Sequence, residues 1–220
     1  MTLRGGEKLN ITFLTDNPRS WIIPHVEALR KRLSRKHSVV LCRSFRQIPR
    51  GDIAFFLGCE RIVPSAVLKR NTHNIVVHPS RLPKGRGFSP LAWQILEGRN
   101  RIPITLFEAV KEVDAGPVYL RDEIKLKGHE LNDQIKAAQG QKTVELVLKF
   151  IRRYPRWHGQ AQKGKPTFYA RRGAEDCRLD PHASFASQFD KLRVADNERY
   201  PAFFRYRGRK YILKIFKEGR

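Results

Sequence analysis

The chain has 220 residues, and 40% of them are hydrophobic, which is enough for one large domain or for one domain with a small appendage. Its 44 Lys and Arg against 21 Asp and Glu give a formal net charge of +23, which favours polyanionic partners such as nucleic acid or nucleotide diphosphates. The absence of a run of about 18 apolar residues and of an apolar signal core predicts a cytoplasmic protein without a membrane span. Three widely spaced cysteines argue against a disulfide framework and against a metal site.

The first 78 residues alternate between apolar runs and amphipathic segments. Runs bounded by turn residues predict strands at 8–15, 39–41, 53–57 and 74–78. Val26, Leu29 and Leu33 recur at helical spacing and predict a helix between the first two strands. This strand–helix–strand order indicates an α/β fold with a doubly wound, Rossmann-like sheet.

The second half of the chain predicts a covering helix and then a boundary. Short helix 90–98 and strands 102–107 and 118–123 are followed by a long helix over 131–151, in which Gly140 indicates a kink. Residues 154–166 have the composition of a linker, with two prolines and two glycines. We therefore expect a domain at 1–155, and at 156–220 a linker with a small α+β unit that ends in a hairpin turning at 207–209.

Two polar residues occupy positions suited to chemistry. His78 ends the strand 74–78 and precedes a loop rich in Pro and Gly, and Asp114 follows thirty-six residues later in another Gly/Pro turn. Because ligands of open α/β sheets bind outside the carboxyl ends of the strands, both side chains are candidates for a reactive pair. The alternatives are a structural histidine and an ordinary turn aspartate.

The segments HPSRLPKGRGFSPLAWQILEG (78–98) and EVDAGPVYL (112–120) resemble the signature of the folate-dependent formyltransferases. This resemblance implies formyl transfer from N10-formyltetrahydrofolate to a primary amine. It also implies that His78 and Asp114 act together in proton transfer and help to stabilise the tetrahedral intermediate.

The sequence departs from the family pattern at one position of the site. The family has asparagine two residues before the histidine, where this chain has Val76. Asn74 shares that strand face, but it lies about 13 Å from His78 along an extended strand and should not reach the same oxyanion. Ser80, Ser89, a loop N–H group or protonated His78 are the candidate donors in its place, and Ser80 is our choice as a third catalytic residue.

The resemblance also implies where the ligands bind. The folate is expected against Phe56, Leu57 and Gly58 and beside the loop that contains Val110 and Val113, although Phe56 could equally be a plain core residue. The segments SWIIPH, GCERIV and DNERYPAFF are similar to sugar N-formyltransferases of the pseudaminic acid pathway, which implies a nucleotide-linked 4-amino-4,6-dideoxy sugar as acceptor, with UDP as the expected nucleotide. The residues expected to bind it are Asp196, Asn197 and Tyr200 for the sugar, and Lys84, Arg86 and Arg193 for the diphosphate.

Two alternatives remain open. The acceptor could be another amine, on methionyl-tRNA or a ribonucleotide, or the chain could be an inactive basic scaffold that binds nucleic acid with a steep salt dependence. The basic residues are spread along the chain rather than clustered, so nucleic acid is not our expected partner. We also expect a homodimer formed through the C-terminal hairpin, which a monomer in sedimentation at micromolar concentration would contradict.

Overall fold

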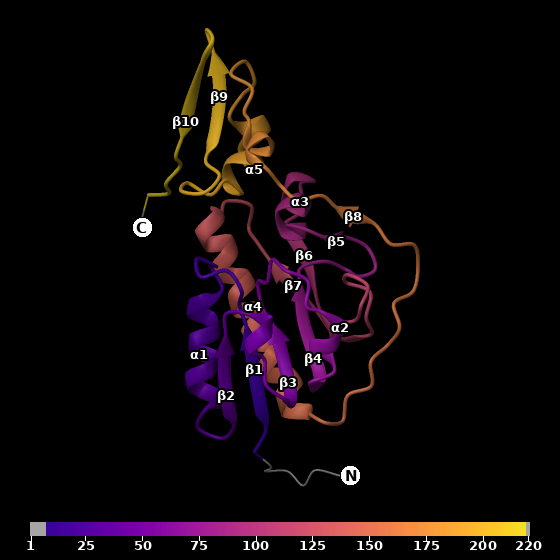
Figure 1. Ribbon diagram of the computed structural model, residues 1–220. Helices are drawn as coiled ribbons and strands as arrows, with labels where there is room; N and C mark the ends of the chain where they lie inside the picture. Colours follow the sequence, from indigo (N-terminus) through magenta and orange to yellow (C-terminus); the bar gives the residue numbers. More distant parts are fainter. Residues whose placement is uncertain (1–7, 219–220) are drawn as a thin grey trace.

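A computed structural model describes residues 8–218 and contains a six-stranded central sheet with the order β2-β1-β3-β4-β6-β7 (Figure 1). The strands are β1 Asn10–Leu14, β2 Ser38–Cys42, β3 Gly51–Phe56, β4 Asn71–His78, β6 Arg101–Glu108 and β7 Val118–Lys125. The first four run parallel, whereas β6 is antiparallel to both β4 and β7. The predicted α/β fold is confirmed. The sheet is mixed because helix α3 (Pro90–Leu96) lies near the carboxyl ends of the parallel strands, so the chain enters β6 from that edge.

The parallel strands are buried on both faces. In β3, Ile53 and Phe55 pack in the cluster that includes α1 (Ile23–Leu33) and α4 (Asn132–Arg153), while Ala54 and Phe56 pack in the cluster that includes α2 (Ser65–Leu68). This alternation follows from the period-two geometry of a strand. Near-continuous apolar runs are therefore required at these positions.

Helix α4 is continuous over its 22 residues, and Gly140 lies near its middle. At Gly140 the imidazole of His25, on α1, packs against the helix, and a Cβ atom at this position would collide with that ring. The glycine therefore allows α1 and α4 to approach each other. Among the described residues, no helix has the length and apolar character needed to cross a membrane.

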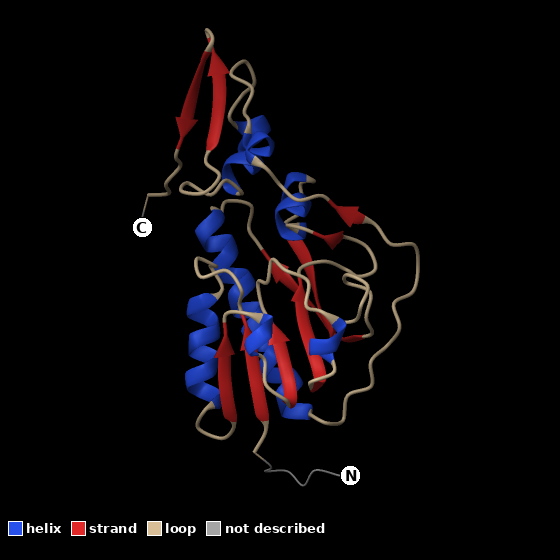
Figure 2. Cartoon of the chain, viewed as in Figure 1, coloured by secondary structure: helices blue, strands red, loops and turns tan. Residues whose placement is uncertain are grey.

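After α4 the chain first passes along the sheet domain and pairs with it, and only then forms a C-terminal unit. Residues 155–172, here called the strap, run outside the sheet, and strand β8 within it (Phe168–Tyr169) pairs in parallel with β5 (Arg86–Gly87). The C-terminal unit then contains α5 (Phe189–Arg193) and the hairpin of β9 (Ala202–Tyr206) and β10 (Arg209–Leu213), which projects above the sheet in Figure 2. Its turn residues Arg207 and Gly208 both have positive φ, as a two-residue hairpin turn requires.

Candidate active site

The candidate site is a cavity of about 590 Å³ at the carboxyl edge of the parallel strands. It continues around the edge of the sheet, because its lining includes both Val76, which packs in the cluster on the α2 side, and Val77, which packs in the cluster on the α1 and α4 side. The loop before α1, the start of α4, the strap and the C-terminal unit also line the cavity, with Trp21, Lys136, Arg171 and Tyr200 among their residues. This placement is the one expected for a ligand site in an open α/β sheet.

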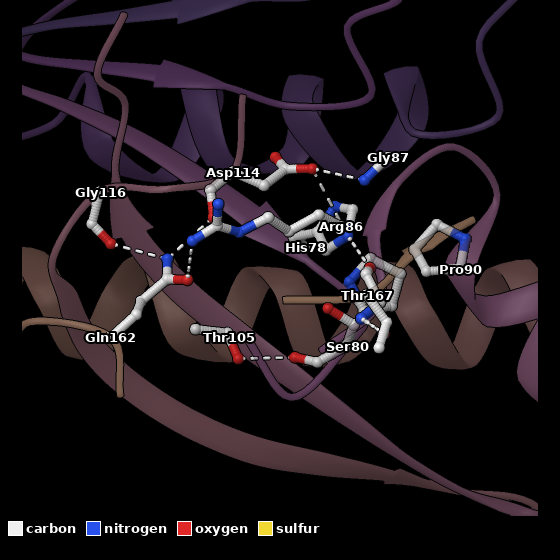
Figure 3. A network of polar contacts seen from close by, with 12 residues as sticks. His78, Ser80, Arg86, Gly87, Pro90, Thr105, Asp114, Gly116, Gln162 and Thr167 are labelled. Atoms are coloured by element: carbon white, nitrogen blue, oxygen red, sulfur yellow. Dashed lines mark hydrogen bonds and ion pairs between the residues drawn. The ribbon is translucent and has the colours of Figure 1, made fainter. Parts of the chain in front are cut away.

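His78 and Asp114 meet in this cavity (Figure 3). The Nε2 atom of His78 lies 2.9 Å from the Gly85 carbonyl oxygen and 3.8 Å from Oδ2 of Asp114. Because a carbonyl can only accept, Nε2 is assigned as the protonated nitrogen, and Nδ1 is left as the basic one. The same Asp114 oxygen accepts a 2.9 Å hydrogen bond from the Gly87 N–H.

The backbone of Asp114 is in the left-handed region, with φ of 53°. Aspartate and asparagine adopt this region more readily than other residues with a side chain, which explains how the turn presents the carboxylate. Both side chains of the pair are nearly buried, with exposed fractions of 10% for His78 and 12% for Asp114. Their interaction is therefore less weakened by water than a surface pair would be.

The strap holds both halves of this pair in place. Gln162 donates hydrogen bonds from Nε2 to the carbonyl oxygens of Asp114 (2.8 Å) and Gly116 (2.9 Å), and its Oε1 accepts one from Arg86. Thr167 accepts a hydrogen bond from the N–H of Gly85, the residue that binds His78 (Figure 3). Sequence reasoning missed Gln162 and Thr167, because their segment has the composition of a linker and no motif indicates these long-range contacts.

The residues that could replace the family asparagine as a hydrogen-bond donor differ in whether they reach the cavity. Ser80 is only 2% exposed, its hydroxyl has no hydrogen-bond partner, and it is not part of the cavity lining. Asn74 donates from its side chain to the Leu68 carbonyl and is likewise outside the lining. Ser89 and Val76 do line the cavity. The structure thus does not place the Ser80 side chain where a catalytic donor would act.

The residues expected to contact the folate all line the cavity. Phe56 and Leu57 are buried at the end of β3, and Gly58 follows them with φ of 63°. Val110 and Val113 lie on the loop before Asp114 and are 39% and 43% exposed. Together they form an apolar wall next to the reactive pair.

The residues expected to bind the acceptor divide into two groups. Asp196 and Tyr200 line the cavity, whereas Lys84, Arg86 and Asn197 do not. Asn197 instead exchanges hydrogen bonds with the backbone of Ile215, and Arg86 binds Gln162.

Arg193 requires a correction. It is 1% exposed and outside the cavity lining, and it donates to Asn100, Asp190 and the Glu130 carbonyl. Its guanidinium therefore joins α5 to neighbouring loops and cannot contact a diphosphate in this structure.

The lining also contains cationic residues that the sequence did not single out. They are Arg61, Lys136, Arg171, Arg172 and Arg199. Lys136 forms a 2.7 Å ion pair with Asp196. Burial alone would raise the pKa of Asp196, but hydrogen bonds from Lys136 and from the N–H groups of Arg199 and Glu198 outweigh it and hold the pKa below its ordinary value.

Two cysteines, Cys59 and Cys177, also line the cavity. Burial, with the negative charge of Asp16, raises the pKa of the Cys59 thiol to about 12. A thiol with such a pKa stays protonated at neutral pH and is a poor nucleophile. His78 and Asp114 thus remain the candidate reactive groups of the cavity.

Comparison with known proteins agrees with this geometry. A protein-family model described as formyl transferase matches residues 25–151. A curated relative, the methionyl-tRNA formyltransferase of Thermotoga maritima, is 27% identical over 171 residues, which cover 75% of this chain and 53% of the relative. The chain thus spans about half the length of the curated relatives it matches first.

Solved structures share the fold at low sequence identity. A methionyl-tRNA formyltransferase from Clostridium thermocellum superposes with a TM-score of 0.82 at 21% identity, over 96% of this chain and 94% of that one. A protein of Mycobacterium tuberculosis described as a sugar N-formyltransferase gives 0.73 at 20% identity, over 96% and 99%. HypX from Aquifex aeolicus, solved with tetrahydrofolic acid, gives 0.77 at 21% identity, over 95% and 38%. The family match covers more than half of the chain and includes both His78 and Asp114, and the chain belongs to the formyl transferase family.

Proposed function

We propose that this protein transfers a formyl group from N10-formyltetrahydrofolate to the primary amine of a nucleotide-linked amino sugar. The observation that carries the transfer reaction is the nearly buried pair of His78 and Asp114 beside the apolar wall of the cavity. N10-formyltetrahydrofolate is the formyl donor of this family, and a structural neighbour was solved with tetrahydrofolic acid. Phe56, Leu57, Val110 and Val113 offer the apolar surface that a pterin ring and its linker would cover.

The pair supplies the two groups that amide formation needs. As the amine nitrogen bonds to the formyl carbon, it becomes positively charged and must lose a proton, which Asp114 or Nδ1 of His78 can accept. The formyl oxygen becomes negatively charged and needs a donor, for which protonated His78 is available. The leaving nitrogen of the folate then takes up a proton as its bond to the carbon breaks.

The sugar acceptor is supported by the C-terminal part of the chain. The tail resembles that of sugar N-formyltransferases, and a structural neighbour described in this way aligns over nearly its whole length. Asp196 and Tyr200 bring polar groups to the cavity from this part of the chain. We keep the pseudaminic acid pathway and its 4-amino-4,6-dideoxy sugar as the specific proposal for the acceptor.

A second candidate acceptor is methionyl-tRNA. It is favoured by the curated relatives, which are methionyl-tRNA formyltransferases, and by the net charge of +23. The chain covers only about half of those relatives, so their whole activity does not transfer directly.

A formyl-transfer assay with N10-formyltetrahydrofolate separates the two acceptors. Nucleotide-linked 4-amino sugars and charged initiator tRNA are incubated separately with the enzyme, and products are identified by mass. We expect one formyl unit on a sugar and none on the tRNA, with loss of the product in an Asp114→Asn variant. Product on the tRNA alone would overturn the sugar proposal, and no product with any amine would overturn the transferase.

Self-association through the hairpin stays a prediction. Tyr211 and Ile212 on β10 are 46% and 60% exposed, which leaves apolar surface for a second copy. Sedimentation at micromolar concentration should show a dimer, and a monomer there would contradict it.

A further inference from the structure

Four arginines line the cavity, and three of them, Arg171, Arg172 and Arg199, come from the strap and the C-terminal unit. Arg171 and Arg172 form no ion pair with any described carboxylate, and Arg199 has only the half-exposed Glu60 at 3.8 Å. Lys136 differs from them, because Asp196 pairs with it at 2.7 Å. Three guanidinium groups that line one cavity and have little negative charge beside them are suited to an anion with several oxygens.

Each of these arginines is held in place by its surroundings. The guanidinium of Arg171 lies 4.4 Å from the centre of the Phe88 ring. Arg172 approaches the Val194 carbonyl (3.4 Å) and the Cys177 sulfur (3.5 Å), while its Nε is buried without a partner. A side chain that is already held by such contacts loses less entropy when a ligand binds.

Arg199 is positioned by a tight turn of the C-terminal unit. Asp196 and Tyr200 exchange backbone hydrogen bonds across this turn, and Oδ1 of Asp196 accepts from the N–H of Arg199. The guanidinium lies 5.9 Å from the centre of the Tyr200 ring, and that ring is 46% exposed. An exposed aromatic face next to a cation is suited to a nucleobase with its phosphates.

We propose that Arg171, Arg172 and Arg199 form a subsite that binds the two phosphates of a nucleoside diphosphate, the carrier of the acceptor sugar. This inference rests on the proposed function and replaces Lys84, Arg86 and Arg193, which do not line the cavity. The volume of about 590 Å³ is in the range of small-molecule sites, which favours a nucleotide over a polynucleotide backbone. The strap and the C-terminal unit thus supply specificity, while the α/β sheet supplies the chemistry.

The test measures binding of UDP, and of GDP, CDP and dTDP as a panel, to the full chain by calorimetry. Arg171→Gln and Arg199→Gln change exposed side chains, so both variants should fold, which thermal unfolding verifies. We expect each to weaken the binding of the preferred diphosphate by about tenfold or more, because each removes a charged donor to phosphate. Arg205→Gln, the same charge change on an exposed residue of β9 outside the cavity, should bind within about twofold of the wild type.

Two further measurements separate this subsite from the proposed reaction. Binding of 5-formyltetrahydrofolate, a stable analogue of the donor, should be unchanged in both arginine variants. If the wild type transfers a formyl group but binds no nucleoside diphosphate, or if Arg205→Gln weakens binding as much as the other two, the subsite is refuted while the transferase stands. Competition by tRNA that is lost in Arg171→Gln, with no diphosphate binding, would assign these arginines to RNA instead.

Discussion

Gln162 donates a hydrogen bond to the carbonyl oxygen of Asp114, a residue 48 positions earlier in the chain, at 2.8 Å. The same amide nitrogen also binds the carbonyl of Gly116, so that it holds the two ends of the turn that presents the carboxylate. Because the Asp114 backbone is left-handed, such a turn needs external support to keep its shape. The strap is therefore part of the candidate active site.

The first prediction concerns this support. Gln162→Ala should lower kcat by about ten- to a hundredfold. Without the hydrogen bonds of Gln162, Asp114 can shift relative to His78, and a small error in the orientation of such a pair slows the reaction strongly. The KM for the folate should change less, since the apolar wall is untouched. Steady-state kinetics over pH 6–9 should also show an altered pH profile of kcat, which a merely structural weakening would not produce.

The neighbouring Gln160 provides the matched control. Gln160 also lies in the strap, and its backbone pairs with Val118 of β7. Its side chain is exposed and forms no hydrogen bond among the described residues. Gln160→Ala should therefore retain near-normal kcat. Equal losses in the two variants would mean that the strap acts only through general stability.

The second prediction tests whether His78 and Asp114 act in catalysis rather than in stabilising the fold. His78→Asn and Asp114→Asn should each abolish measurable turnover, with folate binding and thermal stability close to those of the wild type. Asparagine is the appropriate replacement at position 114, because it tolerates the left-handed backbone and can still accept from the Gly87 N–H. Alanine at this position would add backbone strain to the loss of charge. Near-normal activity of either asparagine variant would remove that residue from its assigned role.

The third prediction concerns Val76, which stands where the family has asparagine. The Val76 side chain packs with Leu82, Phe107 and Val118, and with the cluster around Phe56. Val76→Asn should therefore destabilise the protein by about 1–3 kcal/mol, because it places an amide among apolar groups. Activity should fall as well, because Val76 also lines the cavity and its displacement would disturb the site.

The control for this substitution is Val76→Ile, which keeps the apolar character. It should retain more activity than the asparagine variant in a formyl-transfer assay. A rise in activity with Val76→Asn would show instead that an amide donor is what the site lacks.

How far the sequence predicts this site depends on the range of the interactions. The meeting of His78 and Asp114 at the sheet edge could be predicted, because strand ends and Gly/Pro turns are local patterns. Their role as a reactive pair was implied by the family resemblance and stays a prediction. Gln162 and Arg171 could not be predicted as site residues. Their contacts depend on the pairing of β8 with β5, more than 80 residues apart, and no local sequence pattern indicates that pairing. Arg193 was misassigned for a similar reason: only the tertiary contacts with Asn100 and Glu130 bury it.

The fourth prediction concerns the ion pair between Asp196 and Lys136, which joins the C-terminal unit to α4. The pKa of Asp196 is lowered in the folded protein, so the unfolded chain binds its proton more readily. Its contribution to stability is therefore present above the ordinary value of about 3.8 and is lost as the pH falls through the lower, folded value. Thermal unfolding of the wild type between pH 7 and pH 2 should show this loss. Asp196→Asn should flatten the acid side of the profile, and an unchanged slope would contradict the assignment.

The last prediction tests why α4 contains a glycine. In an isolated helix, Gly140→Ala would stabilise by about 1 kcal/mol, because alanine has the higher helix propensity. Here the new Cβ would collide with the imidazole of His25, so we expect a net destabilisation of about 1–3 kcal/mol and a lower Tm. In a His25→Ala background the collision is absent, and the same substitution should become neutral or stabilising. A double-mutant cycle of unfolding free energies measures this coupling directly, and additive effects would show that His25 is not what excludes the side chain.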